Sequence, residues 1–211
     1  MLELAHAGAN VLHPRSVETA KLNKVPLRVR SSFKTDNLGT LILGVDKMEI
    51  NKAVTGIAVD LSQARIVVCS VPDKPGTAAK VFSALAKENI SVDMIIQSYA
   101  DKENNTNDIA FTMNSDDAGV ALETLKSLKN DLNFTEVEAN FDIAKVSVVG
   151  AGMIGRPGIA SKMFKALADA DINIKMIATS EIKISCLVDK NDTQKAIRIL
   201  HDTFELNSSS I

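Results

Sequence analysis

Three glycines in the carboxyl-terminal half have the spacing of a nucleotide-binding turn. Gly150, Gly152 and Gly155 fit the pattern G-x-G-x-x-G, an apolar run precedes them, and a helical pattern follows. In a dinucleotide-binding fold, such glycines let the backbone turn tightly and approach a pyrophosphate at a helix amino terminus. Taken by itself, the spacing would indicate a nicotinamide-dependent oxidoreductase.

An internal repeat argues against nucleotide chemistry. The segment from Pro75 to Ser98 aligns without gaps with the segment from Pro157 to Ser180, and 12 of the 24 positions are identical. Such a match indicates a duplicated unit. The equivalent turn in the first copy, "SVPDKPG", lacks the glycine pattern, and Lys175 stands where a ribose-binding acid would be expected. We therefore expect the glycines to permit a tight turn instead.

Each copy predicts the same order of elements. An apolar strand comes first, Pro-Gly then opens a helix, and a strand hairpin and a second helix follow. The first helix of each copy carries apolar residues at i, i+3, i+4 and i+7. They are Ala78, Val81, Phe82 and Leu85 in the first copy, and Ala160, Met163, Phe164 and Leu167 in the second. The order βαββαβ predicts an α+β fold of two tandem ferredoxin-like units, each with helices on an antiparallel sheet.

The second copy has no fourth strand of its own. The first copy has one, "FTEVEAN", whereas the second ends in the polar segment "ELNSSSI". An unpaired sheet edge is a liability, and the apolar segment Ala53–Asp60 lies just before the first copy. We expect it to complete the second sheet, so that the first unit is inserted in sequence within the second. The alternative is that it pairs elsewhere or forms an independent edge strand.

Composition excludes several classes of protein. A net formal charge of −2 and the absence of Trp provide neither a basic field nor a stacking surface for nucleic acid. No apolar run reaches the roughly 18 residues that span a bilayer, and the amino terminus lacks a signal-peptide pattern. Both cysteines lie in apolar strand-like runs, which favours buried thiols and a cytoplasmic location. The histidines show no metal-ligand spacing, so no metal site is expected.

The repeat and several further segments resemble a known family. A tandem βαββαβ pair with "DKPG" and "RPG" turns is similar to a pair of ACT domains, the small-molecule-sensing modules of amino-acid metabolism. "GANVLHPRSVETA", "VPLRVRSSF", "GTLI" and "TSEIKIS" resemble the carboxyl-terminal half of aspartate kinase. The resemblance covers roughly Met1 to Leu206. It implies that residues 1–45 are the tail of an amino-acid-kinase catalytic domain, 61–141 a first ACT domain, and 53–60 plus 142–206 a second.

The resemblance implies a regulatory role. Aspartate kinases phosphorylate L-aspartate with ATP and Mg²⁺, the first step to lysine, threonine and methionine, and their nucleotide-binding segment has no counterpart here. We expect this chain to be inactive alone, to need no cofactor, and to mediate feedback inhibition by lysine and/or threonine. Its expected partners are a second copy, paired through the ACT domains, and a catalytic kinase domain or subunit. It is expected to be a truncation or a separate regulatory subunit, for which Met48 is a plausible start.

A stand-alone ACT-type amino-acid sensor or interaction module is the alternative from another class of protein. The kinase-like tail from Met1 to about Leu43 argues against it, because a pure sensor has no use for that segment. His13, Arg15, Arg28 and Arg30 lie in this tail. We expect them to have structural or salt-bridging roles, and we assign no catalytic residue.

An α-amino acid needs hydrogen-bond donors for its carboxylate and an acceptor for its ammonium. The helices that begin at Gly76 and Gly158 offer free N–H groups and the positive end of a helix dipole, while Asp73 and Asp93 offer negative charge. The resemblance implies effector contacts in both copies. They are Asp73, Lys74, Pro75, Gly76, Thr77, Ala78, Ser91, Val92, Asp93 and Gln97 in the first copy, and Ile159, Ala160, Asn173, Ile174, Ser180 and Glu181 in the second.

Several of these residues also have ordinary structural interpretations. Asp73, Ser91 and Asn173 are typical turn residues, and Asp93 is equally compatible with a solvated strand charge. In the second copy Lys175 replaces Asp93, so two unlike sites are expected, with Glu181 as the candidate for the missing negative charge. In the family the effector lies between regulatory units that pair side by side, which implies that an interface completes the pocket.

Overall fold

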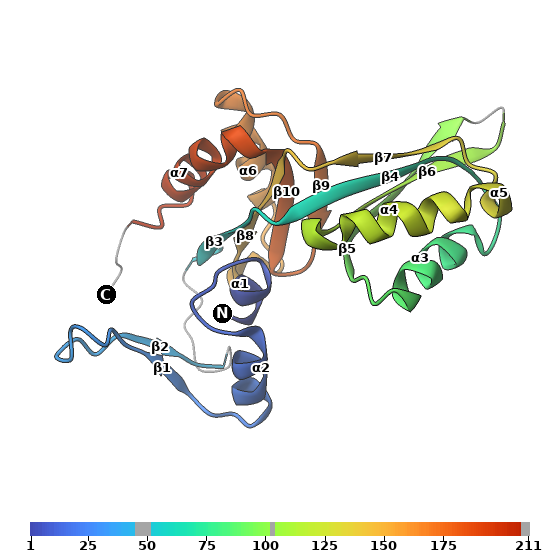
Figure 1. Cartoon of the computed structure of the whole chain (residues 1–211). Coiled ribbons are helices and arrows are strands. Elements are labelled where there is room, and N and C mark those ends of the chain that lie inside the picture. The colour runs from blue at the N-terminus through green and yellow to red at the C-terminus, as the bar shows by residue number, and fades with distance from the viewer. Residues whose placement is uncertain (45–51, 102–103, 208–211) are drawn as a thin grey trace. The chain divides into compact units, whose positions relative to one another are not determined.

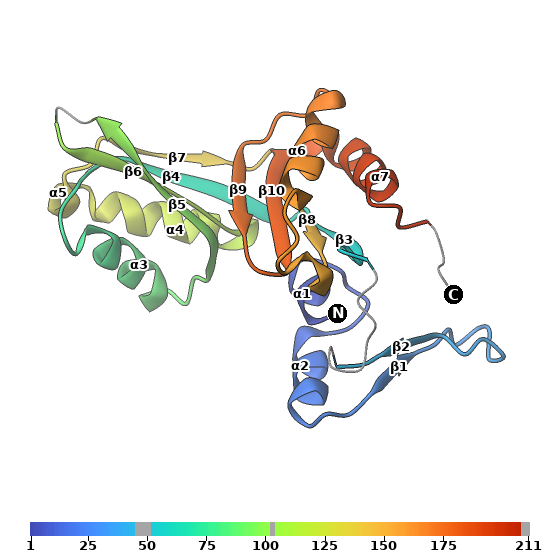
Figure 2. The same cartoon turned by 180° about the vertical axis from the view of Figure 1, so that it is seen from behind.

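The structure, a computed structural model, describes residues 1–44, 52–101 and 104–207 (Figures 1 and 2). Met48, the expected alternative start, lies outside the described residues. The chain divides into two compact units. One consists of Leu61–Lys145 with Asp189–Asn191, and the other holds the remaining described residues. The amino-terminal segment therefore belongs to the same unit as the second copy of the repeat.

The first copy follows the predicted order of elements. They are β4 (Gln63–Pro72), α3 (Thr77–Lys87), β5 (Val92–Asp101), β6 (Thr106–Asn114), α4 (Ala118–Ser127), the single turn α5 (Lys129–Leu132) and β7 (Glu136–Asn140). The sheet order is β5-β6-β4-β7, and every neighbouring pair is antiparallel. Figure 1 shows α3 and α4 together on one face of this sheet.

The core of the first copy lies between that face and the two helices. Ile66 and Phe111 from the sheet and Leu85 from α3 are at most 1% exposed. The ring of Phe82 packs edge-on against Phe111, with 5.5 Å between the ring centroids. The helical face expected from the i, i+3, i+4, i+7 spacing is thus the face that packs on the sheet.

The second copy uses a strand from before the first. Its elements are β3 (Gly56–Asp60), β8 (Ile143–Val149), α6 (Ile159–Asp169), β9 (Met176–Thr179), β10 (Lys183–Asp189) and α7 (Thr193–Thr203). The sheet order is β3-β8-β10-β9, so β3 is the additional strand that the sequence led us to expect. Val146 and Val148 of β8 pack with Met163, Leu167 and Leu200 from the helices, and Figure 2 shows α6 and α7 on this side of the sheet.

The glycine pattern is explained by backbone packing. Gly150 is extended, with φ −178°. A Cβ on Gly150 would lie 2.0 Å from the carbonyl oxygen of Ala53 and 2.7 Å from Cα of Val54. Its lack of a side chain therefore lets the chain entering β3 lie directly against the end of β8, where Thr55 donates its N–H to the Val149 carbonyl at 2.8 Å. Gly155, at φ +69°, makes the turn that was expected.

The amino-terminal segment contains two helices and a hairpin. Its elements are α1 (Leu2–His6), α2 (Pro14–Leu22), β1 (Leu27–Val29) and β2 (Thr40–Ile42), and β1 pairs antiparallel with β2. His13 caps α2 by accepting the Arg15 N–H at Nδ1. Arg28 and Arg30 donate to the carbonyls of Leu38 and Asn37, respectively. These side chains brace the local fold, which fits the structural roles expected for them.

Burial differs between the two cysteines. Cys186 is buried, as expected, whereas Cys69 is only half-buried, so the expectation was wrong for that thiol. Cys69 alternates along β4 with the core residues Ile66 and Val68 and therefore does not point into the helix-covered core. In the described part of the chain, no helix is long and apolar enough to cross a membrane.

Candidate functional site

The two helix amino termini that follow Pro-Gly have the same geometry. Gly76 precedes α3 at φ +93° and Gly158 precedes α6 at φ +94°, both in the left-handed region. Neither helix has a side-chain cap. A Cβ on either glycine would meet no atom within 4 Å. Glycine is therefore needed for the backbone conformation, and the space beside it is open to an approaching anionic group.

The loop that leads to α3 is held by main-chain hydrogen bonds. Asp73 donates its N–H to the Asn105 carbonyl at 2.9 Å, and Asn105 returns a bond from Nδ2 to the Asp73 carbonyl at 3.3 Å. The hydroxyl of Thr77 donates to the Pro72 carbonyl at 3.0 Å. These bonds fix the path of the loop. The half-buried carboxylate of Asp73 takes part in none of them.

A β-bulge in β4 aims the chain into this loop. Ser70 has φ +57°, and its N–H donates to Oδ1 of Asp108 at 2.8 Å. The register against β6 shifts at this point, between Val68 and Val71. Bulges of this kind re-aim a strand next to a functional loop.

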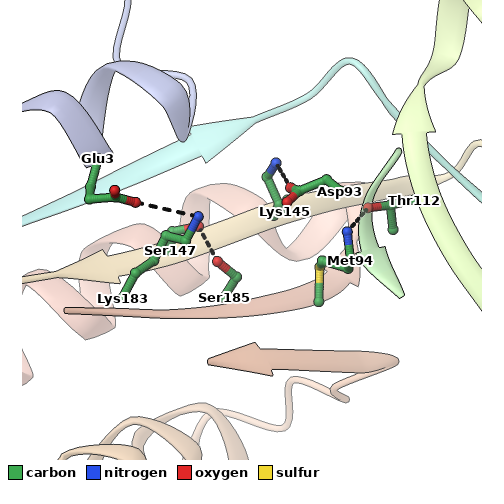
Figure 3. Close-up of polar contacts among 8 residues, drawn as sticks. All are labelled: Glu3, Asp93, Met94, Thr112, Lys145, Ser147, Lys183 and Ser185. Carbon is green, nitrogen blue, oxygen red and sulfur yellow. Dashed lines mark hydrogen bonds and ion pairs between the residues drawn. The ribbon is translucent and has the colours of Figure 1, made fainter. Parts of the chain in front are cut away.

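Asp93 lies in a second bulge, near the start of β5. The register against β6 shifts between Val92 and Ile95, and the Met94 N–H is satisfied by the Thr112 hydroxyl at 3.1 Å. The Asp93 carboxylate accepts a hydrogen bond from the ammonium of Lys145, with 2.6 Å between Oδ2 and Nζ (Figure 3). The Lys145 side chain is 6% exposed and that of Asp93 is 46% exposed. Asp93 thus already neutralises a buried ammonium from its own chain.

The candidate residues of the first copy fall at two ends of its sheet. Val92 lies opposite Met113, whereas Pro72 lies opposite Thr106. Seven residues along β6 correspond to about 23 Å. The group Ser91–Asp93 is therefore far from the group Asp73–Ala78, and the exposed Gln97 lies between them, opposite Ile109. The two predicted negative charges do not come together within one copy.

The second copy divides its candidate residues in the same way. Ser180 and Glu181 form the turn between β9 and β10, where the Ser180 N–H donates to the Lys183 carbonyl at 2.8 Å. That turn is at the end where β8 leaves the sheet toward α6, which begins with Ile159 and Ala160. Asn173 and Ile174 precede β9 at its other end. In each copy, the candidate residues are therefore divided between the two ends of the sheet.

Sequence reasoning missed Lys145 and Asn105. The repeat contained a signal for the first, because Arg65 stands at the equivalent place in "ARIVV" against "AKVSVV". Because burial of an unpaired charge is unfavourable, a basic residue in each of two apolar strands indicates an acidic partner. Asn105 acts through main-chain and amide bonds, for which we find no sequence signal. Among the described residues, no cluster of His, Cys, Asp or Glu could hold a metal ion.

Comparison with known proteins agrees with this architecture. Two models of the ACT domain match the chain, one over residues 65–132 and one over residues 146–204. The aspartokinase of Corynebacterium glutamicum is 46% identical over 208 residues, which are 98% of this chain and 49% of that protein. The chain spans about half the length of the curated aspartokinases that it matches.

Solved structures extend the comparison to shorter chains. The regulatory subunit of aspartate kinase from Thermus thermophilus is 44% identical with a TM-score of 0.68, and the match covers 72% of this chain and 99% of that one. A structure of aspartokinase alpha and beta subunits matches at 45% identity, TM-score 0.68 and the same coverage. Escherichia coli aspartokinase III in complex with lysine and aspartate is 29% identical with a TM-score of 0.70, covering 96% of this chain and 44% of that one. The chain therefore belongs to the aspartokinase family, as its carboxyl-terminal regulatory region with two ACT domains.

Proposed function

We propose that this region senses lysine and/or threonine and confers feedback inhibition on an aspartokinase catalytic domain. The observation that carries the proposal is the pair of uncapped helix amino termini at Gly76 and Gly158, which face open space. The main-chain N–H groups at such a helix start suit a carboxylate. The lysine complex of the related E. coli enzyme supports the same class of effector.

A complete pocket in this proposal requires two regulatory units. Each copy separates its helix amino terminus from its strand-start residues by the length of the sheet, so one copy cannot hold both ends of an amino acid. We infer that a second copy of the chain supplies the missing half, which makes the homodimer part of the site. The structure of aspartokinase alpha and beta subunits supports association between aspartokinase chains. We also infer that the first ACT domain is wholly inserted in the second, with boundaries at 61–141 and at 53–60 plus 142–206.

Asp93 has a narrower role in this proposal than negative charge alone. Because Lys145 already neutralises its carboxylate, Asp93 would act on an effector ammonium as a hydrogen-bond acceptor through its exposed part. Asp73 and Glu181 then become the main sources of unbalanced negative charge in the first and second copies. We propose all sixteen effector contacts named from the sequence, with Asp93 as a hydrogen-bond acceptor and with Asp73 and Glu181 as the charged groups.

The rest of the function follows from membership of the family. ATP, Mg²⁺ and L-aspartate would bind to the catalytic domain, and this region would bind none of them. We place the protein in the cytoplasm, with the other enzymes of amino-acid biosynthesis. A stand-alone sensor is disfavoured, because the kinase-like segment forms one compact unit with the second ACT domain.

Calorimetry with lysine and with threonine, and with NAD as a control ligand, tests the proposal. We expect saturable binding of at least one amino acid, none of NAD, and a dimer in light scattering that becomes more stable as the ligand saturates. Asp73→Ala should weaken binding by about tenfold, the effect of losing one charge-assisted contact. Asp131→Ala, an exposed carboxylate on α5, is the matched control. If neither amino acid binds, the sensing function is wrong for this chain.

A further inference from the structure

The sheet of the second ACT domain carries a layer on the face turned away from α6 and α7. Ile57 and Val59 of β3 pack into the helix-side core, so Gly56 and Ala58 face the other way. The Cβ position of Gly56 is 3.1 Å from Cδ2 of Leu4, a residue of α1. The helix α1 of the kinase-like segment therefore lies on this second face, where its Ala5 and the following Ala7 are buried.

Close backbone packing holds the end of α1 against β3. Gly8 has φ +108°, and a Cβ there would lie 2.2 Å from the Val59 carbonyl oxygen. No other residue fits at this contact without displacing the helix or the strand. The contact is therefore a fixed point between the kinase-like segment and the sheet.

An ion pair ties α1 to β10 as well. The Lys183 ammonium lies 3.6 Å from the Glu3 carboxylate, and the side chains are 25% and 32% exposed, respectively. Figure 3 shows Glu3 reaching from α1 toward Lys183, beside the buried pair of Ser147 and Ser185. Lys183 is also the residue whose carbonyl accepts the Ser180 N–H, so the candidate effector turn and the α1 anchor share one residue.

We propose that α1 is the contact through which the second ACT domain passes its effector state to the kinase-like segment. This proposal rests on the proposed function. A ligand that engages Ser180 and Glu181 moves the start of β10, and Lys183 carries the change to Glu3 and α1. The ligand can change the docking of α1 only by its difference in affinity for the docked and undocked states, and by linkage the docking must change the affinity for the ligand by the same factor.

Hydrogen exchange at Leu2–Gly8, with and without saturating lysine or threonine, tests the proposal on the full chain. We expect ligand to change exchange of α1 by about fivefold or more, the lower range of allosteric couplings. Glu3→Gln should reduce that change by about threefold. Asp169→Asn is the matched control, because it removes a carboxylate from the exposed Lys165–Asp169 pair on α6.

Gly8→Ala provides a second variant with a stronger effect. Its Cβ would push α1 off β3, so we expect the exchange response to vanish and the amino-acid affinity to shift by the coupling factor measured in the parent chain. Gly119→Ala is the control, since its Cβ would meet no atom within 4 Å. Ligand binding without any change at α1, or unchanged affinity in a folded Gly8→Ala chain, would overturn this proposal and leave the sensing function standing. Absence of binding would overturn both.

Discussion

Asp93 and Lys145, 52 residues apart in the chain, form an ion pair in which one partner is buried and the other is half-exposed. The asymmetry matters because burial decides the cost of losing a partner. A half-exposed carboxylate regains water when its lysine is removed, whereas a buried ammonium loses its counter-charge and stays buried.

Two single substitutions should therefore have unequal effects on stability. Lys145→Met, which replaces the buried ammonium by an apolar side chain of similar length, should change the free energy of unfolding by about 1 kcal/mol or less. Asp93→Asn should destabilise by about 2–3 kcal/mol, since the ammonium then lacks this carboxylate. Urea denaturation of both variants measures the difference. Equal losses would mean that the pair is energetically symmetric and that burial does not govern it.

Substitution by alanine should also affect stability differently at Gly150 and at Gly76. Gly150→Ala places a Cβ within 2.0 Å of a backbone oxygen, which must force Ala53 away from β8, so we expect a loss of more than about 3 kcal/mol. Gly76→Ala meets no atom, and only the strain of positive φ opposes it, about 1–2 kcal/mol. Thermal unfolding distinguishes them. Gly150→Ala with parental stability would contradict the close approach of β3.

The hydroxyls of Ser147 and Ser185 form a buried pair with 2.8 Å between the oxygens. Each single change to alanine leaves the other hydroxyl without this partner inside the sheet and should cost about 1–2 kcal/mol. The double variant should cost less than the sum, with a coupling energy of about 1 kcal/mol. A double-mutant cycle measures that coupling, and strict additivity would show that the two hydroxyls act independently.

Both thiols should be poor nucleophiles at neutral pH. Burial raises the pKa of Cys186 to about 12, and burial together with the carboxylates of Glu138, Asp108 and Glu136 raises the pKa of Cys69 to about 11. At pH 8 only about one Cys69 thiol in a thousand is ionised. Labelling with a disulfide reagent should be slow in the folded chain and fast in urea.

The same pKa values set the direction of a pH effect on stability. Unfolded thiols ionise first as the pH rises past their ordinary pKa of 9.0, so the folded state then binds more protons than the unfolded state. The thiol contribution is therefore fully present below pH 9 and is lost as the pH rises toward 11 and 12. Cys186→Ala should flatten the alkaline part of the stability profile. An unchanged slope above pH 9 would contradict the raised pKa.

The repeated units could be predicted because their information is local. The apolar residues Val81 and Leu85, and their counterparts Met163 and Leu167, recur at helical spacing, and burial of that stripe leaves few alternatives to a helix packed on a sheet. The place of β3 was also predictable, since an unpaired edge in the second copy required a strand and one apolar segment was free.

Only the tertiary structure decided which polar groups meet. Nothing in the local sequence indicates that Asp93 pairs with Lys145, that Glu3 pairs with Lys183, or that the Ala53 carbonyl packs against Gly150. These contacts depend on strand register and on the path of the chain between elements. The separation of Asp73 from Asp93 has the same origin. Because β4 and β5 both pair antiparallel with β6, they run in the same direction, so the end of β4, which leads to Asp73, and the start of β5, which holds Asp93, lie at opposite ends of the sheet. The sequence by itself determined the duplication through its repeated segment, the buried faces through helical periodicity, and the family through the resemblance of several segments. The partners of each charge and the division of each candidate site between two ends of a sheet arise from folding in three dimensions, where distance along the chain no longer sets proximity.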